Sequence, residues 1–103
     1  MSKKASLDQK QLRAIGHKLK PVVTVAGNGL SDNVLQEVQR ALDDHELIKV
    51  KIAVGDRDAR SALVETLCAE TGATLVQSVG NIVLLLKRVK KPDPRLSNLI
   101  RVL

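Results

Sequence analysis

The 103-residue chain contains no phenylalanine, tyrosine or tryptophan. Many domains that bind single-stranded nucleic acid, such as RNA-recognition motifs and OB-folds, stack bases on aromatic side chains. That mode of recognition is excluded here. Any contact with a nucleic acid must use phosphates, sugars and the shape of the polymer.

Residues that carry catalysis or hold metals are also scarce. The single cysteine, Cys68, cannot form a disulfide within the chain, and His17 and His45 are the only histidines. Their positions do not give the ligand spacing of a zinc site, and no nucleophile, base and acid are placed as a hydrolase triad requires. We therefore expect no catalytic residue, no metal and no cofactor, and we expect Cys68 to be an inert thiol in a helix.

The sequence also lacks an apolar run long enough to cross a bilayer, and its N-terminus does not have the features of a secretory signal. A lone cysteine fits a reducing compartment. The length allows one domain with one modest core. These features predict a cytoplasmic, monomeric protein with no membrane partner.

What the chain has in excess is positive charge, with a formal net charge of +6. Residues 1–20 carry six lysines and arginines against Asp8, and residues 87–103 carry six against Asp93. Residues 21–48 are acidic, with five carboxylates against Arg40. Two basic ends flanking an acidic segment indicate one positive surface and a polyanionic partner.

Hydrophobic spacing predicts the order α-β-α-β-α-β-β. The first helix should begin at Ser6, with Gln9 completing a capping box, and should end before Pro21. Its apolar face is Leu12, Ile15 and Leu19, and the opposite side carries Lys10, Arg13, His17 and Lys20. A second helix, capped by Ser31, should run to about Asp44.

The rest of the chain predicts a strand, a third helix and a hairpin. Residues 47–54 alternate in the manner of a half-exposed strand, with Lys49 and Lys51 on the open face. The third helix should close at Gly72, and Gly80-Asn81 should form the turn of a two-stranded hairpin. The expected fold is α/β (α+β), with a mixed four-stranded sheet and helices packed on it. Beyond Val89 we expect a linker, followed by a short helix near Leu96 to Leu103.

The stretch "VVTVAGNGLS" places a glycine loop between the first strand and the second helix. It lacks the Gly-Lys-Ser/Thr ending of a P-loop and the third glycine of a dinucleotide site, so we expect no small-molecule substrate. The alternatives that remain are a tight turn and a loop that approaches a phosphate backbone. Lysines near the loop in the sequence favour a polymer backbone; they are Lys18, Lys20, Lys49 and Lys51.

The segments "LRAIGHKLKPVV", "GNGLSDNVLQEV", "HELIKVKI", "TGA", "VQSVGN" and "IVLLLKR" resemble, in this order, bacterial YhbY-type proteins. These are the stand-alone form of the CRM domain, named for chloroplast RNA splicing and ribosome maturation. The resemblance implies a fold similar to the C-terminal domain of translation initiation factor three. It also implies RNA binding and association with precursors of the large ribosomal subunit. Ala26 stands where the family's loop has its first glycine.

We therefore expect a non-enzymatic RNA-binding protein that acts in assembly of the large ribosomal subunit, with ribosomal RNA as its partner. Residues 1–88 should form the CRM domain and residues 89–103 a basic tail. The expected RNA-binding residues are Lys10, Arg13, His17, Lys18, Lys20, Gly27, Asn28, Gly29, Lys49, Lys51 and, from the "DR" pair, Arg57. The alternatives are a basic DNA-coating protein of the Alba type and a protein-interaction adaptor that uses the acidic helix.

Overall fold

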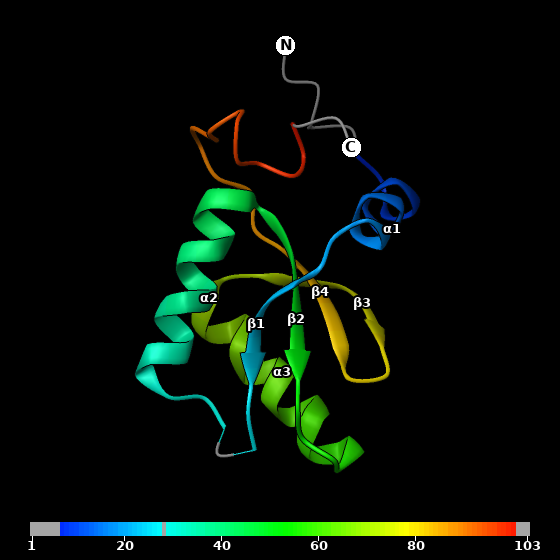
Figure 1. Cartoon of the computed structure of the whole chain (residues 1–103), viewed down its shortest axis with the longest axis vertical. Coiled ribbons are helices and arrows are strands. Elements are labelled where there is room, and N and C mark those ends of the chain that lie inside the picture. The colour runs from blue at the N-terminus through cyan, green and yellow to red at the C-terminus, as the bar shows by residue number, and fades with distance from the viewer. Residues whose placement is uncertain (1–6, 28, 101–103) are drawn as a thin grey trace.

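The computed structural model describes residues 7–27 and 29–100, and it confirms the predicted order of helices and strands (Figure 1). The elements are α1 (Gln9–His17), β1 (Pro21–Val25), α2 (Asp32–His45), β2 (Leu47–Ile52), α3 (Arg57–Thr71), β3 (Thr74–Val79) and β4 (Ile82–Leu86). The four strands form one sheet in the order β1-β2-β4-β3.

The sheet is mixed, as predicted. β1 and β2 are parallel and are joined by the α2 crossover, whereas β4 pairs antiparallel with both β2 and β3. The carboxyl ends of β1 and β2 therefore lie at one end of the sheet, where the Ala53 N–H donates to the Val25 carbonyl at 2.8 Å. The hairpin turn lies at the same end, because the Ile52 N–H donates to the Asn81 carbonyl at 2.7 Å.

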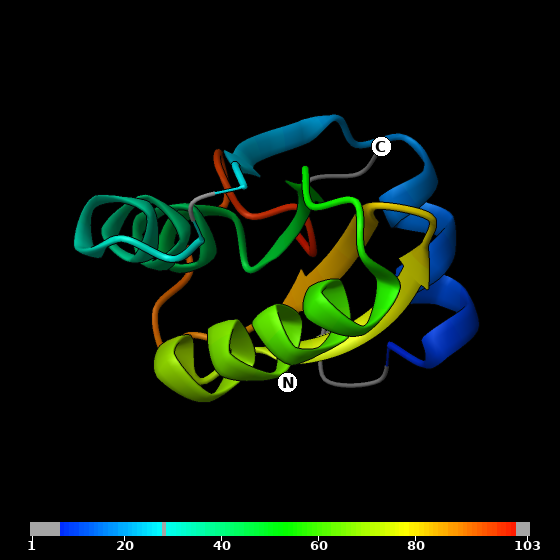
Figure 2. The same cartoon turned by 90° about the horizontal axis from the view of Figure 1, so that it is seen from below.

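The larger core lies on the face of the sheet that α2 and α3 cover (Figure 2). Leu42 from α2 and Leu67 from α3 are fully buried there against Val25, Val50 and Leu85 of the sheet. Burying a large aliphatic side chain contributes about 1.5–3 kcal/mol. This face accounts for most of the apolar packing that holds the domain together.

A smaller core lies on the other face, beneath α1. Its buried members are Leu12, Leu47, Leu84 and Leu99. The helix approaches the sheet closely at Gly16, where an added Cβ would lie 2.5 Å from a Leu84 methyl carbon. The prediction that residues 47–54 form a half-exposed strand is therefore wrong for Leu47. The reason is that α1 and the C-terminal segment cover that end of β2.

The helix caps agree with the sequence in part. Ser31 caps α2, with its hydroxyl accepting from the Val34 N–H at 3.2 Å, and Gly72 ends α3 with a left-handed φ of 77°. The capping box of α1, however, is formed by Asp8 and Gln11 rather than by Ser6 and Gln9. Asp8 is the better N-cap because its carboxylate accepts from the Gln11 N–H at 2.8 Å. Ser6 lies outside the described residues.

The short helix predicted near Leu96 to Leu103 does not form in residues 96–100, the part of it that the structure describes. Residues 94–96 and 98–100 form turns instead, and Ser97, Asn98 and Leu99 are buried. Pro92 and Pro94 disfavour helical backbone in the residues before them. Residues 101–103 lie outside the described part of the chain.

Candidate nucleic-acid interface

A cleft of about 460 Å³ lies between α1 and the open part of the sheet face, and we call it the α1 cleft. Three of the predicted RNA-binding residues on α1 line it, together with Lys49 of β2. Apolar side chains from the hairpin make up much of the rest of the lining; they are Val79, Ile82 and Leu84. The structure thus brings together four residues from two elements, although Lys49 follows His17 by 32 positions in the chain.

The positions of these side chains follow from the helical period of α1 and from the alternation of side chains along β2. Lys10, Arg13 and His17 are spaced i, i+3 and i+7, so they lie on one side of the helix, while Leu12 and Gly16 are buried against the sheet. On β2, Lys49 alternates with the buried Val50 and therefore faces α1. All three α1 residues are exposed and Lys49 is half-buried, so the cleft presents its cations to solvent.

Lys51 extends this cationic face along β2. It lies in register with Thr24 on β1 and Ile82 on β4, and its side chain is exposed. Residues two apart on a strand point to the same side. Lys49 and Lys51 therefore belong to one face of the sheet, as predicted, although Lys51 does not line the α1 cleft.

The glycine loop begins at the carboxyl end of β1. Gly27 is exposed, and Gly29 has a left-handed φ of 88° with its N–H donating to the Ala26 carbonyl at 3.0 Å. Asn28 is outside the described residues. Apart from the glycine itself and its chain neighbours, no described atom lies within 4 Å of a Cβ built on Gly27 or Gly29, so a ligand can approach the backbone at either residue.

Lys18 and Lys20 do not join the loop in space. Both follow α1, which ends at His17, and both precede β1. They therefore lie at the amino end of a five-residue strand, and the loop lies at its carboxyl end. An extended strand rises about 3.3 Å per residue, which separates the two groups by roughly 17 Å. These two lysines and the glycine loop therefore lie at opposite ends of β1, and their binding to one RNA backbone stays a prediction.

Arg57 lies on a different cleft. It is the first residue of α3 and lines a cleft of about 770 Å³ between α3 and the hairpin, on the α2–α3 side of the sheet. The neighbouring Arg60 donates to the carbonyls of Val54 and Gly55 at 3.0 and 3.1 Å, which ties α3 to the end of β2. Sequence spacing gave no signal of this structural role, because it depends on carbonyls in a loop.

The described residues offer little for bond-making chemistry. Cys68 is half-buried on α3, and burial raises the pKa of its thiol above the ordinary value, so it is protonated at neutral pH. Across residues 7–27 and 29–100, no three His, Cys, Asp or Glu side chains are grouped to hold a metal ion. Within the same ranges, no helix is long and apolar enough to cross a membrane.

Comparison with known proteins places this arrangement in a family. The model of the CRS1/YhbY (CRM) domain matches residues 6–87. The chain belongs to the CRS1/YhbY (CRM) domain family. This confirms the predicted resemblance, and the α1 cleft and the glycine loop both lie within the CRM domain.

Relatives of the CRM domain are similar over most of their length. A Pseudomonas aeruginosa protein named as a probable RNA-binding protein is 53% identical over 93 residues, which cover 90% of this chain and 89% of the relative. A Haemophilus influenzae protein named as RNA-binding is 46% identical over 81 residues, covering 78% and 82% of the two chains.

A solved structure supports the same fold. The solution structure of a Staphylococcus aureus protein superimposes with a TM-score of 0.72 at 26% identity, and the match covers 88% of this chain and 93% of that one. The fold class predicted from the sequence is therefore confirmed by both the described elements and the comparison.

Proposed function

We propose that the protein binds RNA through the α1 cleft, the lysines of β2 and the glycine loop, and that it does so without catalysing a reaction. The observation that carries the proposal is the α1 cleft, where Lys10, Arg13, His17 and Lys49 converge on one surface. The names of the family members support RNA as the polymer. In the absence of aromatic side chains, the contacts are made mainly to phosphates and sugars.

The partner we propose is ribosomal RNA in precursors of the large ribosomal subunit, bound by a cytoplasmic monomer. Phosphate contacts position a protein on RNA but carry little sequence information. Selectivity then comes from the shape of the folded RNA, which a rigid cleft and a loop on a fixed sheet are suited to recognise. Binding of this kind can hold an RNA fold during assembly without any bond being made or broken.

The test is a titration of a structured segment of large-subunit ribosomal RNA, followed by fluorescence anisotropy at several salt concentrations. If about five phosphates are neutralised, log K falls with log salt at a slope of about −3.5 to −4.5. Duplex DNA of the same length is the competitor. A slope near zero, or stronger binding to the DNA, would contradict the proposal.

Two variants that lose the same charge test whether binding depends on one particular surface or only on the net charge of the protein. The cleft variant, Lys10→Gln/Arg13→Gln/Lys49→Gln, removes three positive charges from the α1 cleft. The α2 control, Asn33→Asp/Gln36→Glu/Arg40→Gln, lowers the net charge equally at exposed positions on α2, which packs on the other face of the sheet. We expect the cleft variant alone to reduce the magnitude of the salt slope, by about two to three. Equal losses in the two variants would mean that net charge alone drives binding.

A further inference from the structure

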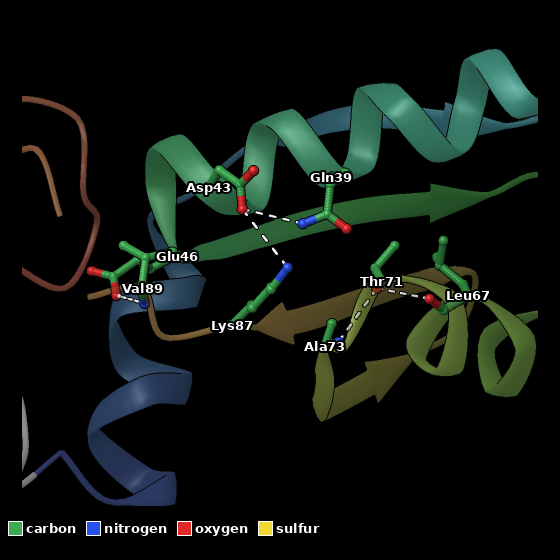
Figure 3. A network of polar contacts seen from close by, with 8 residues as sticks. All are labelled: Gln39, Asp43, Glu46, Leu67, Thr71, Ala73, Lys87 and Val89. Carbon is green, nitrogen blue, oxygen red and sulfur yellow. Dashed lines mark hydrogen bonds and ion pairs between the residues drawn. The ribbon is translucent and has the colours of Figure 1, made fainter. Parts of the chain in front are cut away.

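One buried carboxylate closes residues 89–97 into a loop, which we call the Glu46 loop. The Glu46 Oε2 atom accepts from the Val89 N–H at 2.8 Å, and its Oε1 atom accepts from the Ser97 hydroxyl at 2.7 Å. Figure 3 shows Glu46 and Val89 at the end of α2. The two oxygens of a single side chain thus hold both ends of the loop.

Both the burial and the backbone conformation of Glu46 are unfavourable for a glutamate. Its side chain is completely buried, and its φ of 63° makes it the one non-glycine residue with positive φ in the described ranges. A buried carboxylate is costly unless it is hydrogen-bonded, and left-handed backbone favours glycine. Strained residues persist where the surrounding structure fixes them, and they are frequent at functional sites. A glycine at this C-cap would relieve the strain but could not close the loop.

Further contacts fix the interior of the loop and the residues after it. The Asp93 carbonyl accepts from the N–H groups of Leu96 and Ser97 at 2.9 and 2.8 Å, and its carboxylate accepts from the Arg95 N–H at 2.9 Å. Pro92 and Pro94 restrict the backbone on both sides of Asp93.

The segment is also anchored beyond the loop. The Asn98 side-chain amide donates to the Leu47 carbonyl at 2.7 Å, and Leu99 packs in the core beneath α1. Figure 1 shows the loop in orange and red at the end of the molecule where α2 finishes, which is also the end where α1 lies.

Three of the five residues that the loop leaves exposed are cations, and the other two are Pro94 and Leu96. Lys90, Lys91 and Arg95 are all exposed, and the Arg95 side chain retains 90% of its accessible surface. Asp93 is the single carboxylate in the loop and lies 3.7 Å from the Arg95 Nε atom. The neutral polar residue Ser97 and the apolar Leu99 are instead buried. The loop therefore presents three positive charges to solvent from a backbone that hydrogen bonds hold in place.

We propose that the Glu46 loop is a second RNA-contacting site, where Lys90, Lys91 and Arg95 bind phosphate groups of the same RNA that occupies the α1 cleft. The inference rests on the proposed function, but the loop lies beyond residues 6–87, the part that the CRM family model matches. Cations on a closed loop lose less conformational freedom on binding than cations on a free tail. The buried Glu46 therefore contributes to affinity without touching the RNA.

The first test removes the charges and keeps the loop, in the variant Lys90→Gln/Lys91→Gln/Arg95→Gln. We expect affinity for the ribosomal RNA segment to fall about tenfold at moderate salt and the salt slope to decrease in magnitude by about two. The α2 control defined above carries the same loss of net charge and should retain both values. A loop variant that binds like the control would overturn the inference while leaving the proposed function intact. Wild-type protein that binds no RNA would overturn both.

The second test loosens the loop and keeps every charge, in the variant Pro92→Gly/Pro94→Gly. Because the same phosphates are neutralised once RNA is bound, the salt slope should be unchanged while affinity falls about two- to fivefold. Thermal unfolding monitors whether the domain stays folded, and Ser97→Ala, which removes one of the two closing hydrogen bonds, is a second variant with the same expected result. Wild-type affinity in folded forms of both variants would overturn the role of loop closure.

Discussion

Gly27 and Gly29 lie two residues apart in the glycine loop, but a side chain would have a different effect at each. Both positions are open, with no atom within 4 Å of an added Cβ. Gly29, however, has a φ of 88°, whereas Gly27 does not have a left-handed φ. Left-handed backbone costs an L-residue roughly 1–2 kcal/mol. A substitution at Gly29 therefore changes stability, and one at Gly27 changes mainly the bulk that a ligand meets.

This difference makes Gly27→Val the sharper test of the loop. We expect it to weaken RNA binding by about fivefold or more and to change the free energy of unfolding by less than about 0.5 kcal/mol, as for an ordinary surface substitution. Gly29→Ala is the comparison variant, and it should lower stability by about 1 kcal/mol. Urea unfolding and RNA titration of the same samples give both quantities. Wild-type RNA affinity for Gly27→Val would mean that the loop is only a turn.

At the scale of the elements, the decisive feature is how α1 is attached to the sheet. The helix has only nine residues and packs through the small core that contains Leu12 and Leu84. Gly16 permits this contact, because an added Cβ would lie 2.5 and 2.8 Å from the two Leu84 methyl carbons. The orientation of Lys10 and Arg13 toward the sheet therefore depends on one glycine on the buried side of the helix.

We expect Gly16→Ala to destabilise the protein and to weaken RNA binding together. Alanine favours helix by about 1 kcal/mol relative to glycine, but overpacking costs about 1–3 kcal/mol. The steric cost should prevail because the Cγ atom and both methyl carbons of Leu84 would lie within 3.2 Å of the added Cβ, so the whole side chain must shift. Urea unfolding measures the loss.

The matched control for this prediction is the double variant Gly16→Ala/Leu84→Val, in which a smaller residue makes room for the added methyl group. Its loss of stability should be less than the sum of the two single losses, since the residues are in contact. Strictly additive losses would show that the close approach of α1 at Gly16 is not what limits its packing.

The elements themselves could be predicted from the sequence because their signals are local. Periodicity gave the order of helices and strands, and Gly72 and Gly80 marked a helix end and a hairpin turn that the structure confirms. The grouping of Lys10, Arg13 and His17 likewise followed from helical spacing.

Features that depend on distant parts of the chain were not predictable in this way. The burial of Leu47 depends on α1 and on Leu99, which is 52 positions away in the sequence. Glu46 showed no local sign of a left-handed backbone, because its hydrogen bonds to Val89 and Ser97 form only in the folded protein. The separation of Lys18 and Lys20 from the glycine loop required the length and direction of β1.

Within the part of the chain that the structure describes, the two faces of the sheet differ in charge. The exposed cations of α1 and the lysines of β2 lie on one face, and the acidic helix α2 packs on the other, where Asp43 also pairs with Lys87 at 3.8 Å (Figures 2 and 3). A charge distribution of this kind orients a protein as it approaches a polyanion. On the proposed RNA partner, it would favour one docking orientation, with α2 facing away from the RNA.

The final prediction concerns the ribosomal particle with which the protein would associate through the proposed RNA. We expect the protein to sediment at or just below the large-subunit peak in gradient fractions of a cell extract, and to be absent from polysomes. Contacts made mainly to phosphates weaken steeply as salt rises, so the association should be present at low salt and lost at moderate salt.

A transient association follows from the same physics. Because phosphate contacts carry little sequence information, selectivity depends on RNA shape, and that shape changes as a particle matures. Loss of the docking surface would then release the protein without an energy-consuming step. The cleft variant should leave the particle at lower salt than the wild type, and the α2 control should stay with it. Recovery with small subunits, with polysomes or with chromosomal DNA instead would refute the large-subunit assignment, and the last of these would favour a DNA-coating role.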